Sequence, residues 1–192
     1  MQSLIDGLIE EHQRLTDTVR RELPGRLVSV AELLIERIGA GQTVFWCGNG
    51  GSAADAQHLA AELVGRFNQD RRGLPSIALS TNAPAVTAIG NDYGFDAVFA
   101  RQVEALARKG DVLMAVSTSG NSANVVRAVE SARNEGVTTV GLLGRDGGVL
   151  ADLCDLAIVV PGNDTARIQE MHILIGHIFC DLVERSCIGV DT

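Results

Sequence analysis

The chain has 192 residues, which is enough for one well-packed domain and too few for two of ordinary size. Hydrophobic residues make up 46% and charged residues 21%, a balance that excludes general disorder. The 16 basic and 24 acidic side chains give a formal net charge of −8, which disfavours a nucleic-acid partner because such binding depends on Lys and Arg.

The spacing of apolar residues predicts two helices and then an alternation of short strands and longer helices. The first helix covers 3–22 and is broken by Pro24 and Gly25, and the second covers 27–38. Beyond them we expect a polar loop between 79 and 96, strands at 43–47, 76–79, 111–116, 137–143 and 157–160, and helices at 52–67, 96–108, 122–134 and 165–184. This order is typical of βαβ units, so we expect an α/β fold with a parallel sheet and helices on both faces.

The last predicted helix is apolar on nearly every side, and the first also carries many apolar residues. In so small a chain, such helices indicate burial against another subunit, so we expect an oligomer. No apolar run approaches the ~20 residues of a membrane span, and acidic residues occupy the place of a signal peptide's basic start. We therefore expect a cytoplasmic protein without membrane contact, with buried free thiols at Cys47, Cys154, Cys180 and Cys187.

Two loops follow strands and lead into helices, at the sheet edge where α/β folds bind ligands. One is glycine-rich, from Gly48 to Ser52, and the other is rich in hydroxyls, from Ser117 to Ser122. Free N–H groups at a helix N-terminus favour anions, so together the loops predict a phosphorylated small molecule. The first loop also fits a dinucleotide pattern loosely, but the next strand lacks the acidic residue that a nicotinamide cofactor requires. The second loop could instead be an ordinary helix cap.

Candidate acid–base groups lie on two of the predicted helices. His58 and Glu62 are four residues apart and share a helix face, either as a surface pair or at the edge of a site. Gln169 and His177 are about 80° apart around the last helix and ~12 Å apart along it, so they share one ligand only if their side chains converge or act from different subunits. His172 faces elsewhere, and we expect it to be structural.

Four segments, in this order and spacing, resemble the sugar isomerase (SIS) domain family and, within it, the phosphoheptose isomerases. They are CGNGGSAADAQHLAAELVGRF from Cys47, GNDYGF from Gly90, STSGNS from Ser117 and RIQEMHILIGH from Arg167. The resemblance implies one SIS domain over 1–192, with N-terminal oligomerisation helices in 1–40 and an α/β core in 41–192. It also implies a three-layer αβα sandwich with a five-stranded, mostly parallel sheet, and a homotetramer with sites at subunit contacts.

The activity that the resemblance implies is conversion of sedoheptulose 7-phosphate to D-glycero-D-manno-heptose 7-phosphate through an enediol, for nucleotide-activated heptose biosynthesis. Glu62 and His177 would be the catalytic pair, and one Zn²⁺ per subunit would be held by the residues matching His58, Glu62, Gln169 and His177. The other residues implied in substrate binding, beside Glu62 and Gln169, are Asn49, Gly50, Gly51, Ser52, Asn91, Asp92, Ser117, Thr118, Ser119 and Ser122.

One position departs from some family members, which carry an acidic residue where this chain has Ala166. Asp164 stands two residues earlier, so the role in ring opening that the resemblance implies for a carboxylate at position 166 does not carry over to this chain. Two alternatives stay open. One is a non-catalytic SIS scaffold of the DnaA initiator-associating type, although that group lacks the matches to Glu62 and His177. The other is an SIS isomerase for a different sugar phosphate.

Overall fold

Five short strands form one sheet in the order β2-β1-β3-β4-β5, and every neighbouring pair is parallel. This computed structural model describes residues 1–189. The strands are β1 (Val44–Cys47), β2 (Ser76–Ala78), β3 (Val112–Ser117), β4 (Thr138–Gly144) and β5 (Leu156–Val160). The residues of β1 and β3 are all buried and so are those of β4 after the first, as expected for the centre of a parallel sheet that is covered on both faces.

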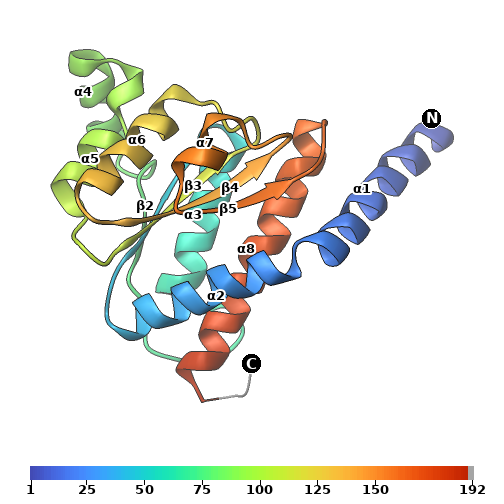
Figure 1. The fold of residues 1–192 in the computed structure, drawn as a ribbon, viewed down its shortest axis with the longest axis horizontal. Coiled ribbons are helices and arrows are strands. Elements are labelled where there is room, and N and C mark those ends of the chain that lie inside the picture. The colour runs from blue at the N-terminus through green and yellow to red at the C-terminus, as the bar shows by residue number, and fades with distance from the viewer. Residues whose placement is uncertain (190–192) are drawn as a thin grey trace.

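Helices cover both faces of the sheet and form a three-layer sandwich (Figure 1). One face packs against α1 (Gln2–Glu22), α2 (Pro24–Gly39), α3 (Gly51–Val64) and α8 (Thr165–Cys187). The other packs against α4 (Ala83–Tyr93), the 3-10 helix η1 (Phe95–Ala97), α5 (Ala100–Leu106), α6 (Ala123–Asn134) and α7 (Gly148–Leu153). The predicted α/β sandwich with a five-stranded sheet and an N-terminal helical pair is confirmed.

Two local predictions were wrong, and one short helix was not predicted. The expected polar loop between 79 and 96 contains α4, which starts after the cap residue Asn82, whose side chain accepts a hydrogen bond from Ala85 N at 3.2 Å. No residue of α4 is fully buried, so its apolar spacing gave little signal. Helix α7 has 6 residues, too few to show a helical period. The helix expected over 96–108 is divided into η1 and the shorter α5.

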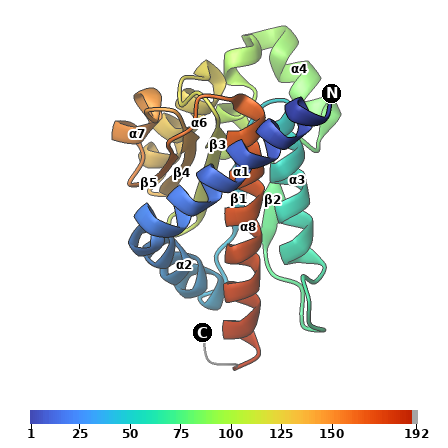
Figure 2. The same ribbon diagram turned by 90° about the vertical axis from the view of Figure 1, so that its right-hand side faces the viewer.

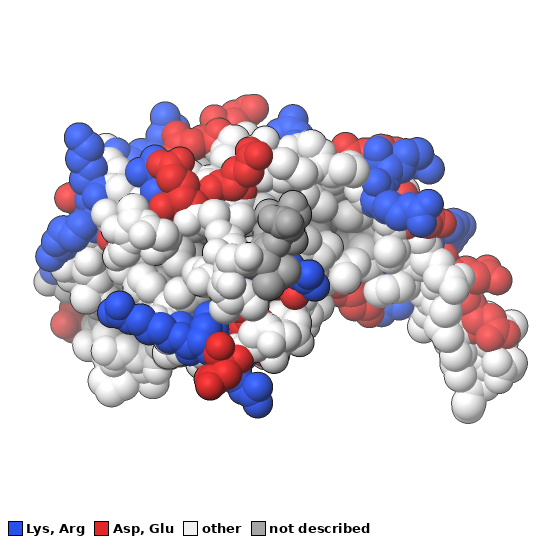
Figure 3. Space-filling model, turned by 90° about the horizontal axis from the view of Figure 1, so that it is seen from below, with Lys and Arg blue, Asp and Glu red and all other residues white. Residues whose placement is uncertain are grey.

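Helix α1 extends from the body of the molecule, and its first turns stand clear of the sandwich (Figure 1). Leu15 and Val19 are its buried residues, whereas its N-terminal half leaves large apolar side chains exposed: Leu4 66%, Ile5 45%, Leu8 44% and Ile9 52%. The extended end of the molecule shows uncharged and acidic surface side by side (Figure 3). No helix in the described part of the chain is long and apolar enough to cross a membrane.

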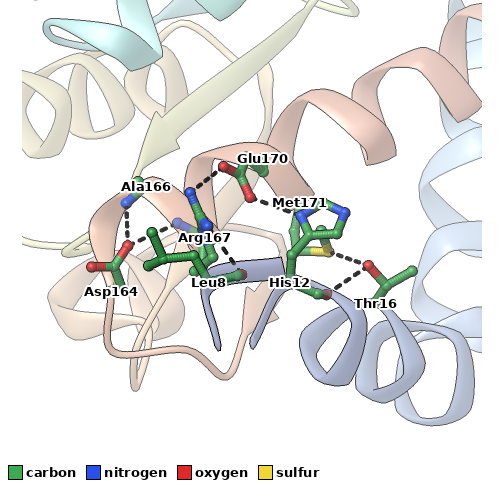
Figure 4. A network of polar contacts seen from close by, with 8 residues as sticks. All are labelled: Leu8, His12, Thr16, Asp164, Ala166, Arg167, Glu170 and Met171. Carbon is green, nitrogen blue, oxygen red and sulfur yellow. Dashed lines mark hydrogen bonds and ion pairs between the residues drawn. The ribbon is translucent and has the colours of Figure 1, made fainter. Parts of the chain in front are cut away.

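A polar network joins α1 to the start of α8 (Figure 4). His12 Nδ1 lies 2.7 Å from Glu170 Oε2, and Arg167 contacts both Glu170 and the carbonyl oxygen of Leu8. Asp164 is the N-cap of α8, because its Oδ1 accepts hydrogen bonds from the backbone N–H of Ala166 and of Arg167 at 2.9 and 3.0 Å. Asp164 therefore has a structural role in starting the helix.

Candidate active site

The two predicted ligand loops lie next to each other because β1 and β3 are neighbours in the sheet. Glycine is needed at Gly48, since a Cβ there would lie 2.9 Å from the carbonyl oxygen of Val116 on β3. In the second loop the hydroxyl of Ser117 lies 3.5 Å from that of Ser119 and 3.4 Å from that of Ser122. Three hydroxyls thus gather before α6, where helix N–H groups favour an anion.

A pair of amides connects the two loops. Asn49 and Asn124 each donate a side-chain N–H to the other's carbonyl oxygen, and both distances are 2.8 Å. Asn124 is buried and lies in the first turn of α6. The sequence analysis missed it, although its position two residues after Ser122 could have indicated a contact with the ligand loops.

Helices α3 and α8 lie side by side and run in the same direction (Figure 2). They approach closely at Gly176, where a Cβ would lie 2.4 Å from the side chain of Leu59. This approach brings the side chains next to Leu59 on α3 close to those next to Gly176 on α8. His58 Nε2 lies 2.8 Å from His177 Nε2 and 3.3 Å from Glu62 Oε1. The structure therefore brings Glu62 and His177 together within one chain.

His58, Glu62 and His177 form a group that fits a metal ion, since one ligand atom from each lies within 4.8 Å of the others. Two imidazole nitrogens and a carboxylate oxygen are donors that zinc accepts. In a tetrahedral zinc site with bonds of about 2.0–2.1 Å, donor atoms are about 3.3 Å apart. The His58–Glu62 separation of 3.3 Å matches this spacing, and the two imidazoles are closer, at 2.8 Å.

Gln169 reaches α3 one turn before His58, where its Nε2 donates to Asp55 Oδ1 at 3.2 Å. Asp55 is buried, and the sequence analysis missed it because an aspartate on an apolar helix face has no motif of its own. Burial raises the pKa of Asp55, while the hydrogen bond from Gln169 and the nearby His58 and His177 act to lower it. Gln169 and His177, both on α8, therefore contact the same stretch of α3, at Asp55 and His58.

The segment that follows α3 packs against His177. The ring of Phe67 packs against His177 with 5.4 Å between ring centroids. The buried carboxylate of Glu184 accepts hydrogen bonds from the backbone N–H groups of 67–69, at 2.7 to 2.9 Å. The side chain of Arg71 is also buried. It lies 3.2 Å from Glu184 and donates to the carbonyl oxygens of Glu62 and Leu63 at the end of α3. This ion pair fixes the turn on which Phe67 stands.

Two predicted substrate-binding residues are not part of these contacts. Asn91 and Asp92 lie on α4 with exposed side chains, and Asn91 Nδ2 donates to Asp92 Oδ1 at 2.8 Å. The remaining predicted residues lie at the start of α3 and in the hydroxyl-rich loop. Gly50 and Gly51 are at the start of α3 beside the buried Ser52, and Thr118 is half-buried in the hydroxyl-rich loop.

His172 is buried, and its Nε2 donates to the carbonyl oxygen of Leu143 at 2.9 Å. Burial lowers the pKa of His172 from 6.5 to about 4, so the folded protein keeps this ring neutral while the unfolded chain takes up a proton below pH 6.5. We therefore expect stability to fall as the pH drops from 6.5 towards 4, with His172 contributing a loss of about 2 kcal/mol at pH 5.

Urea unfolding at pH 7.5 and pH 5 measures this loss against the variant His172→Gln. Glutamine retains an N–H donor for Leu143 and does not titrate. All other groups titrate in both proteins, so the difference between the two pH dependences isolates His172. Equal losses in the two proteins would contradict the assignment.

Comparison with known proteins places the chain among close relatives. A model of the SIS domain matches residues 8–144. The phosphoheptose isomerase of Nitratiruptor sp. is 59% identical over 182 residues, covering 95% of this chain and 97% of that protein. The solved phosphoheptose isomerase of Neisseria gonorrhoeae superposes with a TM-score of 0.90 at 45% identity, covering 95% of this chain and 98% of that one. That of Francisella tularensis gives 0.92 at 36% identity, covering 96% and 100%.

Proposed function

This chain belongs to the SIS domain family, and we propose that it is an aldose–ketose isomerase that converts sedoheptulose 7-phosphate to D-glycero-D-manno-heptose 7-phosphate. The observation that carries the proposal is the meeting of Glu62, His58 and His177 within 4.8 Å in one chain. Relatives named phosphoheptose isomerase over nearly the whole chain support the substrate. The reaction moves a proton between carbons 1 and 2 through an enediol and needs no redox cofactor.

In this proposal the hydroxyls of Ser117, Ser119 and Ser122 and the N-terminus of α6 bind the phosphate. Ser52 and Thr118 assist them, and the backbone of Asn49, Gly50 and Gly51 borders the sugar. A phosphate held at one end fixes the distance of the carbonyl end from the catalytic groups. Glu62 then removes a proton from one carbon, exchanges it with solvent and returns a proton to the other carbon, since a single carboxylate can serve both steps. His177 carries a proton between the two sugar oxygens and assists ring opening.

The cofactor that we propose is Zn²⁺, one per subunit, held by His58, Glu62, Gln169 and His177. The donor set of two imidazoles, a carboxylate and an amide oxygen suits zinc, although glutamine is an uncommon ligand. When bound, zinc would polarise the substrate carbonyl and so make the neighbouring C–H more acidic.

We also propose a cytoplasmic homotetramer. The exposed apolar side chains of α1, and the exposed Leu174 on α8, give each subunit surface to bury against another. The exposed pair Asn91 and Asp92 would then serve an active site at a subunit contact. A tetramer is tested by measuring the mass of the purified protein in solution, which would be four times that of one chain.

The experiment that tests the proposed function is a parallel assay with sedoheptulose 7-phosphate, fructose 6-phosphate and glucosamine 6-phosphate. We expect efficient turnover of the heptulose alone. Preference for another sugar phosphate would favour a different SIS isomerase. Absence of turnover together with binding to DnaA would favour the non-catalytic scaffold. We favour that alternative less, because a scaffold has no use for an acid–base pair such as Glu62 and His177.

A further inference from the structure

The side-chain amide of Gln169 fits tightly between α8 and the start of α3. A Cβ on Gly51 would lie 2.3 Å from its Oε1 and 2.5 Å from its Nε2, so the amide occupies space that only glycine leaves open. Its one side-chain hydrogen bond within the described chain is the 3.2 Å bond from Nε2 to Asp55 Oδ1. The position of the amide is therefore set by Gly51 and its rotation by Asp55.

Asp55 has no other assigned task in the described structure. It is 8% exposed, forms no ion pair with Lys or Arg among the described residues, and its Oδ2 is buried without a hydrogen-bond partner. An unpaired buried carboxylate costs stability, so its presence calls for an explanation. It lies one helical turn before His58, on the side of α3 that faces α8.

The chemistry of the contact decides which way the amide turns. Asp55 Oδ1 accepts a hydrogen bond from Gln169 Nε2, so the contact holds the NH2 end of the amide and not its carbonyl oxygen, which could not donate to it. Because an amide is planar, holding the NH2 group at Asp55 turns the carbonyl oxygen away from it. That oxygen accepts no hydrogen bond from another described residue and is free to bind a ligand.

We infer that Asp55 is a positioning residue that holds the NH2 group of Gln169, so that the amide oxygen joins the donor atoms of His58, Glu62 and His177 at a metal ion. The inference rests on the proposed function for the identity of the metal. Partners that orient a metal ligand from behind commonly account for a 10- to 100-fold change in metal affinity. Without the carboxylate, the amide is free to present either end to the ion.

The test is the zinc affinity of the purified protein, measured without sugar phosphate by competition with a chromophoric chelator. We expect Asp55→Asn to bind zinc at least about 10-fold more weakly than the wild type. Asp55→Glu keeps the charge but displaces the carboxylate, and we expect a similar loss. The matched control is Asp152→Asn, which removes an exposed carboxylate from α7 on the opposite face of the sheet and should leave the affinity unchanged.

A second readout uses the folded, metal-free wild type and so does not depend on the variants folding. One side-chain amide proton of Gln169 should exchange with water more slowly than those of exposed glutamines in its NMR spectrum, because it is hydrogen-bonded to buried Asp55. Zinc affinity within two-fold of the wild type in Asp55→Asn would overturn the inference. Wild-type zinc affinity in Asp55→Glu would also overturn it, because the charge of the carboxylate and not its position would then account for the effect. A wild type that does not bind zinc would overturn it as well. Sugar-phosphate turnover, assayed separately, judges the proposed function independently.

Discussion

Replacement of Glu62 by glutamine is expected to reduce isomerase turnover by about 100- to 10,000-fold, the range that a positioned general base contributes. Glutamine has the same shape as glutamate but cannot accept a proton from carbon. The structure places this carboxylate 3.3 Å from His58 Nε2, in the group that also contains His177. Steady-state kinetics with sedoheptulose 7-phosphate measure the loss, which should lie in kcat rather than in KM.

Two controls accompany this variant. Glu130→Gln removes an exposed carboxylate from α6 and should retain full turnover. Because Glu62 also belongs to the candidate metal group, zinc content and thermal unfolding of Glu62→Gln must be measured beside its activity. A folded, zinc-loaded Glu62→Gln with normal turnover would contradict the assignment of the base.

Replacement of Glu184 by alanine is expected to lower the free energy of unfolding by about 4 kcal/mol, because removing one partner of a buried ion pair leaves the other charge uncompensated. Arg71 would remain buried without its carboxylate, and three backbone N–H groups of 67–69 would lose their acceptor. Although burial acts to raise it, the pKa of Glu184 lies below its ordinary value, because these N–H groups and Arg71 stabilise the carboxylate. Thermal or urea unfolding at one fixed protein concentration measures the change.

The neighbouring ion pair supplies the control. Arg185 lies 2.8 Å from Asp181 on the same helix, but both side chains are partly exposed to solvent. An exposed pair of this spacing contributes about 0.3–0.5 kcal/mol, so Arg185→Ala should change stability little. If the two variants were equally stable, the buried pair would not be the element that holds the turn at Phe67.

The sequence predicted the sheet and the long helices because buried strands and amphipathic helices leave a periodic pattern. It did not predict α4, which buries no residue completely, or α7, which is too short for a period to appear. Buried free thiols were also predicted. All four cysteines are free, but only Cys47 and Cys180 are buried, whereas Cys154 is partly buried and Cys187 is exposed. The expected structural role of His172 is confirmed by its buried hydrogen bond to Leu143.

Only part of the candidate site could be predicted from the sequence. Spacing put His58 and Glu62 on one helix face, but it left open whether Gln169 and His177 could converge. The answer depends on Gly176, which allows α3 and α8 to approach closely, and helical spacing alone does not reveal such a contact. Asp55 and Asn124 were missed for a related reason, since their partners Gln169 and Asn49 are far away in the chain.

The most direct test of the account is isomerisation in D2O, because the proposed reaction removes a carbon-bound proton and returns one from the same carboxylate. Sedoheptulose 7-phosphate equilibrated with the enzyme in D2O should give heptose 7-phosphate with deuterium at carbon 2, detected by mass spectrometry and NMR. The Glu62→Gln variant should incorporate none over the same time. Deuterium that enters carbon 2 as fast with folded Glu62→Gln as with the wild type would contradict proton transfer through Glu62.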